Sequence, residues 1–152
     1  RTSFSSLIRD AHDYTNAFFD RTGREICEGS MVTPGQLGAL AIGVKEICRQ
    51  VPPESLKPGD VLISNDPWLL AGHLNDICVL SPIFFKDRLV AFTACVFHHT
   101  DIGGLGPGIG ANDVHEEGIW LPPAGRSRIS PKRPSECTST ARISPGSPGL
   151  QG

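Results

Sequence analysis

Two apolar runs separated by only three residues constrain the fold of this chain more than any other feature. Residues 77–85 and 89–97 are rich in β-branched, aromatic and other apolar side chains, and the charged residues 86–88 lie between them. A connection this short joins antiparallel strands, because parallel strands need a crossover of a dozen residues or more. The nearly continuous apolarity of both runs predicts strands at the centre of a sheet, with both faces buried.

Shorter strands and a glycine-rich loop are predicted around this central hairpin. The β-prone runs 14–19 and 24–27 flank a turn that ends at Gly23, which predicts a second hairpin with glycine in the left-handed position. Residues 61–64 follow a Pro-Gly-Asp turn and predict a short strand. Residues 102–110 hold five glycines, so this loop either turns sharply or approaches another segment closely.

The clearest helix begins after Thr33, which can serve as the N-cap. Proline follows at the first helical position, and Gln36 lies three residues after the cap. The apolar residues that form one stripe at helical spacing are Leu37, Leu40, Ala41, Val44, Ile47, Cys48 and Val51. Pro52 and Pro53 end the helix. Together these elements predict an α+β fold, with a mixed or antiparallel sheet of hairpins and at least one amphipathic helix.

Composition divides the chain after Pro123. Residues 124–152 hold five Lys or Arg, one acidic residue and no aromatic residue, and they are dense in Ser, Pro and Gly. Such a stretch cannot supply a buried apolar face, so we expect a disordered basic tail after a folded part at 1–123. This tail either has no function, or contacts an acidic partner or nucleic acid, or is non-native sequence from another reading frame. Its scattered basic residues argue against nucleic acid.

The charge and the cysteine pattern exclude several classes of protein. A formal net charge of -2 provides no basic field for nucleic acid. No apolar run approaches the roughly 18 to 20 residues that span a bilayer, so we expect no membrane insertion. The five cysteines form no C-x-x-C pair, and four of them lie in apolar stretches, which predicts a reduced, cytoplasmic protein. The chain has no G-x-x-x-x-G-K-[ST] phosphate loop.

Histidines and acidic residues gather where the central hairpin should bring its two open ends together. His73 and Asp76 precede the first strand, and His98 and His99 end the second. Because the start of one antiparallel strand lies beside the end of the other, we expect His98 close to Asp76. Two imidazoles and one carboxylate suit a catalytic divalent metal. Successive side chains alternate across a sheet, so only one of the adjacent histidines should ligate, and the other should support the site or face a substrate.

Each of these residues also has a purely structural interpretation. Histidines at strand ends commonly cap backbone carbonyls and Asn-Asp pairs commonly make turns, so the short H-x-x-D spacing is not specific. Asp66 follows a predicted strand and either makes an Asx turn or lies at the edge of a site. Glu116 and Glu117 are candidate general bases or solvent-facing residues. Trp68 and Trp120 are expected in the core.

Four ordered blocks of the sequence resemble the hydantoinase B/oxoprolinase family. The blocks are PGDVLISNDPW at 58–68, GHLND at 72–76, HHTDIGG at 98–104 and EGIWLPP at 117–123. The opening part of the chain is similar to the same family, and the resemblance covers about residues 3–123. Family members run to several hundred residues, so the resemblance implies that this chain is an N-terminal fragment of a larger domain.

The resemblance implies ATP-dependent hydrolysis of a small cyclic amide of the hydantoin or 5-oxoproline type. In this family the metal-containing hydantoinase B component acts with a hydantoinase A component, which uses ATP to phosphorylate the substrate. The family's metal ligands map onto His73, Asp76 and His98, where zinc, manganese or iron would bind. We also expect catalytic roles for the block residues His99 and Asp101 and for Asp66.

Two alternatives remain open beside cyclic-amide hydrolysis. Related acetone and acetophenone carboxylases share the architecture, so the chain could belong to a carboxylase. It could also be a truncated, non-catalytic remnant that keeps only a subunit-docking surface. The chain departs from the family pattern at Gln36, where many members have histidine, and around residues 109–110.

Overall fold

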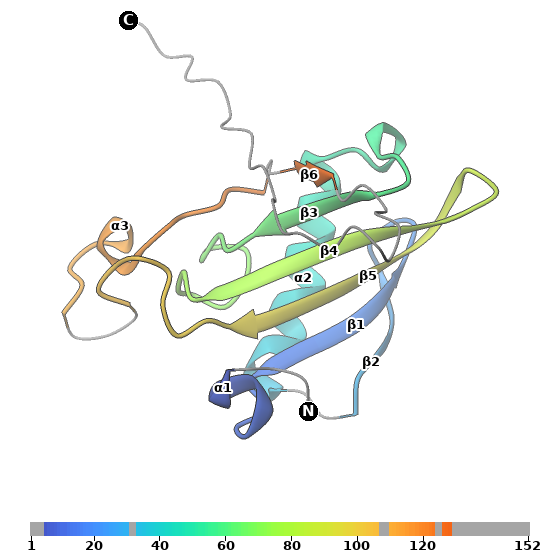
Figure 1. Ribbon diagram of the computed structural model, residues 1–152. Coiled ribbons are helices and arrows are strands. Elements are labelled where there is room, and N and C mark those ends of the chain that lie inside the picture. The colour runs from blue at the N-terminus through green and yellow to red at the C-terminus, as the bar shows by residue number, and fades with distance from the viewer. Residues whose placement is uncertain (1–4, 31–32, 107–109, 124–125, 129–152) are drawn as a thin grey trace, which may run out of the picture.

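The two apolar runs form the middle of a six-stranded antiparallel sheet. The computed structural model describes residues 5–30, 33–106, 110–123 and 126–128. The strand order is β2-β1-β5-β4-β3-β6 (Figure 1). In chain order the strands are β1 (Tyr14–Asp20), β2 (Glu25–Glu28), β3 (Asp60–Ser64), β4 (Asp76–Phe85), β5 (Arg88–His98) and β6 (Arg126–Arg128). The helices are α1 (Ser6–Arg9), α2 (Pro34–Gln50) and α3 (Val114–Glu117), and η1 (Pro53–Ser55) is a 3-10 turn. The predicted α+β class, the antiparallel hairpins and the long helix are confirmed.

The central hairpin has a two-residue turn and a bulge. Lys86 and Asp87 both have positive φ, as in the type I′ turns that join antiparallel strands. The pairing then shifts by one residue, because Phe84 lies opposite Leu89 whereas Ile83 lies opposite Ala91. The odd residue therefore lies in β5 and not in the turn. From the bulge onward the register is constant, and it ends with Asp76 opposite His98.

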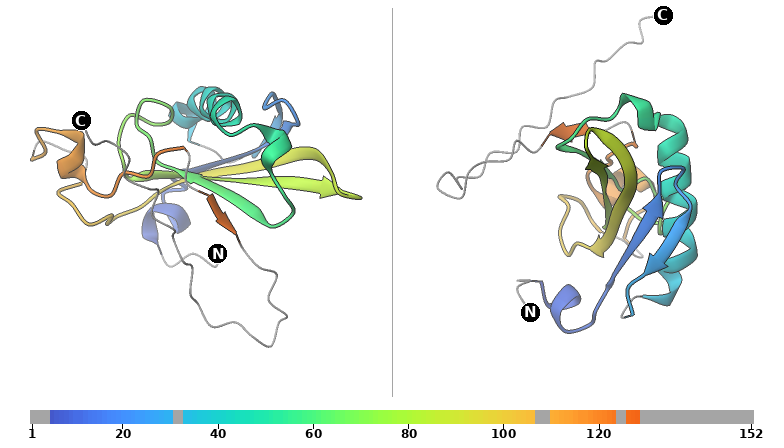
Figure 2. Two further views of the ribbon diagram at one scale, coloured as in Figure 1. Left: turned by 90° about the horizontal axis from the view of Figure 1, so that it is seen from above. Right: turned by 90° about the vertical axis from the view of Figure 1, so that its right-hand side faces the viewer.

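The two faces of the sheet are buried to different degrees. The β4 and β5 side chains that point toward α2 are buried: Cys78, Leu80, Phe92, Ala94 and Val96. The side chains that point the other way, such as Val79 and Cys95, are only half-buried. Figure 2 shows that α2 lies across one side of the sheet. The prediction that both faces are buried is wrong for this part of the chain, because the long helix covers a single face.

Helix α2 begins and ends where the sequence predicts, and most of the predicted stripe residues whose side chains are described are buried. Leu40, Val44 and Ile47 are buried against the sheet, whereas Ile42 on the outer face is 69% exposed. The predicted capping interactions are absent at Thr33: its hydroxyl donates to His12 O at 3.3 Å and to Asp13 Oδ1 at 3.2 Å instead. The Gln36 side chain likewise points away from the cap and toward Asp76, the first residue of β4.

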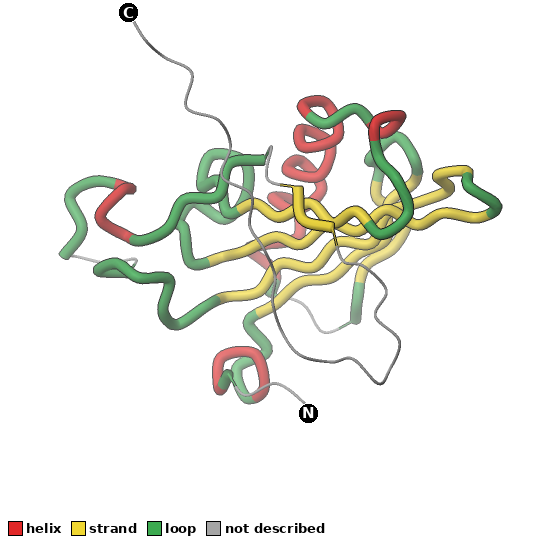
Figure 3. The backbone as a smooth tube through the Cα atoms, turned by 45° about the horizontal axis from the view of Figure 1, so that its top comes forward, coloured by secondary structure: helices red, strands yellow, loops and turns green. Residues whose placement is uncertain are grey.

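The glycine-rich loop approaches another segment closely, which is one of the two possibilities that its sequence offers. Gly103 makes an isolated β-bridge with Gly118. A Cβ atom on Gly104 would overlap with the backbone of Glu117, so only glycine fits there. This contact holds the α3 segment against the loop that follows β5. Figure 3 shows these long loops at one end of the strands.

Three residues that the sequence analysis assigned to the disordered tail, Arg126–Arg128, instead form β6, which pairs antiparallel with β3. The rest of the predicted tail, including Cys137, lies outside the described residues. The four described cysteines are free: Cys48 and Cys78 are buried, whereas Cys27 on β2 is exposed. None of the described helices combines the length and the apolarity needed to cross a membrane.

We predict that Leu40→Ala lowers the free energy of unfolding by about 2–5 kcal/mol, because it leaves a cavity between α2 and the sheet. Leu40 is 1% exposed. The matched control is Ile42→Ala on the same helix, whose exposed side chain should cost less than about 0.5 kcal/mol. Urea unfolding followed by circular dichroism measures both. Equal losses in the two variants would contradict the packing of α2 described above.

Candidate metal centre

Two histidines and one aspartate meet at the open end of the central hairpin. Asp76 begins β4 and His98 ends β5, and His98 Nδ1 lies 2.9 Å from Asp76 Oδ1. His73 comes from the turn before β4, and its Nε2 lies 3.6 Å from Asp76 Oδ2. The two imidazole rings are in an edge contact with their centroids 5.2 Å apart. One donor atom from each of the three residues lies within 4.8 Å of the others.

The Asp76 carboxylate is the most deeply buried member of this cluster, with its side chain 2% exposed, whereas both histidines keep partial contact with solvent. A buried carboxylate is unfavourable unless charged or hydrogen-bonding groups compensate it. Both imidazoles are therefore more accessible to solvent than the carboxylate. A cation at the cluster would have the carboxylate and both rings as neighbours.

The turn that carries His73 is held by side chains from two distant segments. Leu74 N donates to Glu117 Oε2 at 3.0 Å, and Asn65 Nδ2 donates to Leu74 O at 2.8 Å. Asn65 is fully buried, and its amide also bonds to the backbone of Ile119 and Leu121. These contacts join the end of β3, the turn at 72–76 and the segment after α3 into one support for the cluster.

Two further polar residues, which the sequence patterns did not mark as part of a site, adjoin the cluster. Gln36 Nε2 donates to Asp76 Oδ2 at 2.9 Å and reaches Asp13 Oδ1 at 3.5 Å. Asp13 Oδ2 lies 3.9 Å from His98 Nδ1. The only sequence signal for either residue was the departure at Gln36 from the histidine of many family members. Asp13 stands alone in a loop before β1, and nothing in its neighbourhood marks it.

His99 points away from the cluster, as the alternation of side chains along a strand requires. Its ring packs on Phe97, with centroids 4.9 Å apart. Its backbone N–H donates to Asn75 O at 2.8 Å, and its carbonyl accepts from Asn75 Nδ2 at 2.6 Å. Burial lowers the pKa of His99, and the neighbouring charge of His98 lowers it further. The neutral imidazole is therefore favoured near pH 7.

Asp66 and Asp101 both stabilise turns and lie outside the three-residue cluster. Asp66 Oδ1 accepts from Trp68 N at 3.0 Å, which is the Asx turn considered for this residue. Asp101 Oδ1 accepts from Gly103 N at 2.9 Å and shapes the glycine-rich loop. Each of the two carboxylates therefore has a local structural role in the turn that it stabilises.

The expected core position of the two tryptophans is wrong. Trp68 is 72% exposed and Trp120 is also exposed, and their rings meet edge to face with centroids 6.2 Å apart. Glu116, considered as a general base, accepts from Asn112 N at 2.8 Å and caps the segment around α3. Glu117 supports Leu74 as described above.

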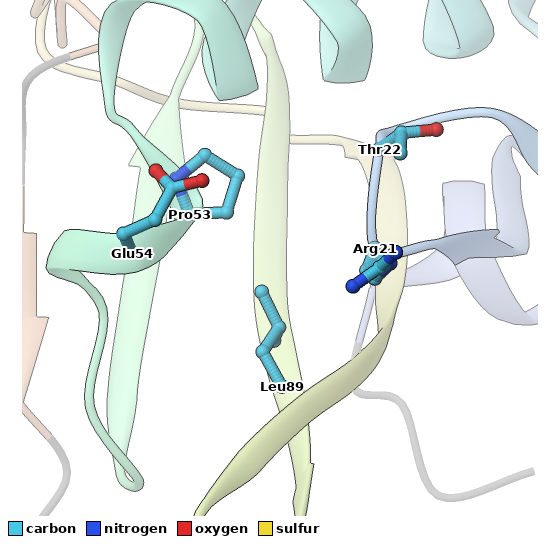
Figure 4. A pocket seen from close by; sticks show the side chains of 5 residues that line it. All are labelled: Arg21, Thr22, Pro53, Glu54 and Leu89. Atoms are coloured by element: carbon cyan, nitrogen blue, oxygen red, sulfur yellow. The ribbon is translucent and has the colours of Figure 1, made fainter.

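A separate hollow lies near the turn end of the hairpin, far from the histidines. Figure 4 shows its lining by Arg21, Thr22, Pro53, Glu54 and Leu89. Its volume is about 400 Å³. Leu89 and His98 are at opposite ends of β5, roughly 30 Å apart at about 3.3 Å per strand residue. This hollow therefore does not belong to the cluster.

The donor set of the cluster fits a divalent cation. Two imidazole nitrogens and a carboxylate oxygen bind zinc, manganese or iron and leave positions open for water or substrate. His73 Nδ1 is buried and has no hydrogen-bond partner among the described residues, so nothing described there fixes the protonated nitrogen of this ring. Among the described residues, no further histidine, cysteine or acidic group belongs to this mutually close set, although Asp13 Oδ2 lies 3.9 Å from His98 Nδ1.

Comparisons with known proteins agree on one family. The family model described as hydantoinase B/oxoprolinase matches residues 1–127. The beta chain of the caprolactamase of Pseudomonas jessenii is 38% identical over 126 residues, which cover 81% of this chain and 21% of that protein. The B component of a putative D-/L-hydantoinase of a Pseudomonas species is 36% identical over 126 residues, covering 78% of this chain and 21% of that protein.

A solved structure has the same fold. The crystal structure of the ATP-dependent caprolactamase from Pseudomonas jessenii superposes with a TM-score of 0.68 at 34% identity. The match covers 82% of this chain and 21% of that chain. This chain therefore spans about a fifth of the length of the caprolactamase and hydantoinase chains named above, and 8% of the 5-oxoprolinase 1 of Arabidopsis thaliana.

We predict that Asn65→Ala lowers the free energy of unfolding by at least about 2 kcal/mol, because it removes the side-chain partner of three backbone groups, Leu74 O, Ile119 O and Leu121 N. Amide hydrogen exchange at Leu121, whose N–H donates to Asn65 Oδ1, should accelerate at the same time. Asn112→Ala, at an exposed asparagine, is the matched control and should leave both quantities unchanged. Unaltered exchange at Leu121 in Asn65→Ala would contradict the anchoring role.

Proposed function

Because this chain belongs to the hydantoinase B/oxoprolinase family, we propose that it supplies the metal centre of an enzyme that hydrolyses cyclic amides. The substrates are of the hydantoin, 5-oxoproline or related lactam type, and the enzyme acts with a hydantoinase A-like subunit that uses ATP. The observation that carries the proposal is the convergence of His73, Asp76 and His98 within 4.8 Å.

His73, Asp76 and His98 would hold the ion, which would be zinc, manganese or iron. A divalent ion held there supplies Lewis-acid polarisation of a carbonyl or a more acidic bound water. Asp76 supplies the charge that attracts the cation, and the two partly exposed imidazoles leave the cation accessible to substrate. The His99 ring packs on Phe97 and points away from the cluster, so its expected catalytic role stays a prediction that does not carry this proposal.

Two observations support a partner subunit that uses ATP. The sequence contains no phosphate loop of its own. The similar caprolactamase and hydantoinase chains are named as subunits, and the caprolactamase of known structure is an ATP-dependent enzyme. We therefore place nucleotide chemistry on the A-like partner and amide chemistry on the side of the histidine cluster.

Metal content of the purified chain tests the centre directly. We expect about one equivalent of zinc or manganese after reconstitution and dialysis, measured by plasma mass spectrometry, and near zero for His98→Ala, which removes one of three ligands. His115→Ala is the matched control, because His115 packs against Trp120 and lies outside the cluster. Equal, near-zero metal in the wild-type chain and in His98→Ala would refute the centre.

Reconstitution with an A-like subunit tests the reaction. We expect ADP release that depends on 5-oxoproline, a hydantoin or caprolactam, and loss of that release in His98→Ala. ATP use that depends on a ketone and bicarbonate would favour the carboxylase alternative. Stable binding of the A-like subunit without turnover would favour a subunit-docking role. Absence of both binding and turnover would reject the proposal for this chain.

A further inference from the structure

We infer that Gln36 is a positioning residue of the centre, which orients the Asp76 carboxylate without neutralising its charge. The inference rests on the proposed metal centre and assigns a role to a residue that lies outside all four sequence blocks. Gln36 lies in the first turn of α2, forty residues from Asp76 in the sequence. Its residue surface is 6% exposed, so its amide is fixed inside the protein and not in solvent.

The contacts of the Gln36 amide determine which way it points. Nε2 lies 2.9 Å from Asp76 Oδ2 and 3.5 Å from Asp13 Oδ1, so the N–H groups face two carboxylates. The reversed amide would direct Oε1 at the same two acceptors, which is electrostatically unfavourable. Gln36 thus holds Asp76 Oδ2, the oxygen nearest to His73, while His98 holds Oδ1.

The neutrality of Gln36 matters as much as its reach. Asp13 and Asp76 both lie beside His98, so two negative groups share one small volume. A lysine or arginine at position 36 would pair with Asp76 and compete with a metal ion for it. An amide donates a hydrogen bond to Asp76 and leaves its full negative charge available to a cation. Outer-shell donors of this kind orient metal-ligating carboxylates.

The other end of the same amide supports a site that accepts a ligand. Gln36 Oε1 is buried and has no hydrogen-bond partner among the described residues. Unpaired buried acceptors are rare because they forgo the bond that water would supply. A water or an N–H group brought by a ligand of the centre would satisfy it. The side chain is therefore arranged to hold Asp76 with one end and to receive a donor with the other.

Cobalt(II) titration of the 152-residue chain tests the inference, because cobalt absorption in the visible range reports ligand geometry. We expect Gln36→Leu to weaken cobalt binding by about 10–100-fold and to change the absorption spectrum at saturation. Thr33→Val is the matched control, since Thr33 bonds to Asp13 from the same end of α2 but not to Asp76. It should bind cobalt with wild-type affinity and spectrum, whatever it does to stability.

The outcomes separate this inference from the metal centre itself. If wild-type chain binds cobalt, His98→Ala does not, and Gln36→Leu matches wild type in affinity and spectrum, the role of Gln36 is overturned and the centre stands. If wild-type chain binds no cobalt, both are overturned.

A second measurement needs no variant and so does not depend on Gln36→Leu folding. In wild-type protein, the side-chain amide protons of Gln36 should exchange slowly with solvent and broaden during cobalt titration, as seen by nuclear magnetic resonance. Rapid exchange, or signals that cobalt leaves sharp, would overturn the role.

Discussion

A single unpaired residue in β5 sets the register on which the histidine cluster depends. Phe85 pairs with Arg88 across the tight turn, and without the shift between Ile83 and Phe84 the same pairing would place Phe97 opposite Asp76. With the shift, His98 lies there. Because side chains alternate across a sheet, a change of one residue would send the His98 ring to the opposite face. A bulge in the strand thus decides whether the two groups can meet.

The burial of Asp76 then organises the segments around it. A carboxylate this deeply buried requires hydrogen bonds or opposite charge. Hydrogen bonds come from His98 on the neighbouring strand and from Gln36 on the helix, and His73 Nε2 on the preceding turn lies 3.6 Å away. The turn itself needs Asn65 and Glu117 to hold its backbone. The polar support of the site therefore joins segments far apart in the sequence. The close contact between Gly104 and the backbone of Glu117 helps to hold the Glu117 segment beside the turn.

Local patterns account for the parts of the fold that sequence reasoning predicted well. The central hairpin, the first hairpin and the long helix depend on neighbouring residues: apolar runs, turn residues, helical spacing and prolines. The predictions that failed required knowledge of what lies beside an element. The outer sheet face and the two tryptophans are apolar in sequence, yet the described part of the chain does not cover them. Arg126–Arg128 carry no strand signal, and they pair because the edge of β3 is available.

The sequence by itself determined the two hairpins, the long helix and the closeness of Asp76 to the end of β5, because an antiparallel hairpin brings its open ends together whatever surrounds it. The bulge in β5 then decided that His98, and not Phe97, lies opposite Asp76. Only the tertiary structure decided that Gln36 and Asp13 adjoin these two residues and that Asn65 and Glu117 support the turn of His73. It also shows that Asp66 and Asp101 make turn hydrogen bonds, and their catalytic roles stay predictions. The physical reason is distance along the chain. Gln36 bonds across forty residues and Glu117 across forty-three, and no local preference encodes contacts that form only when the helix and the late loop pack onto the sheet.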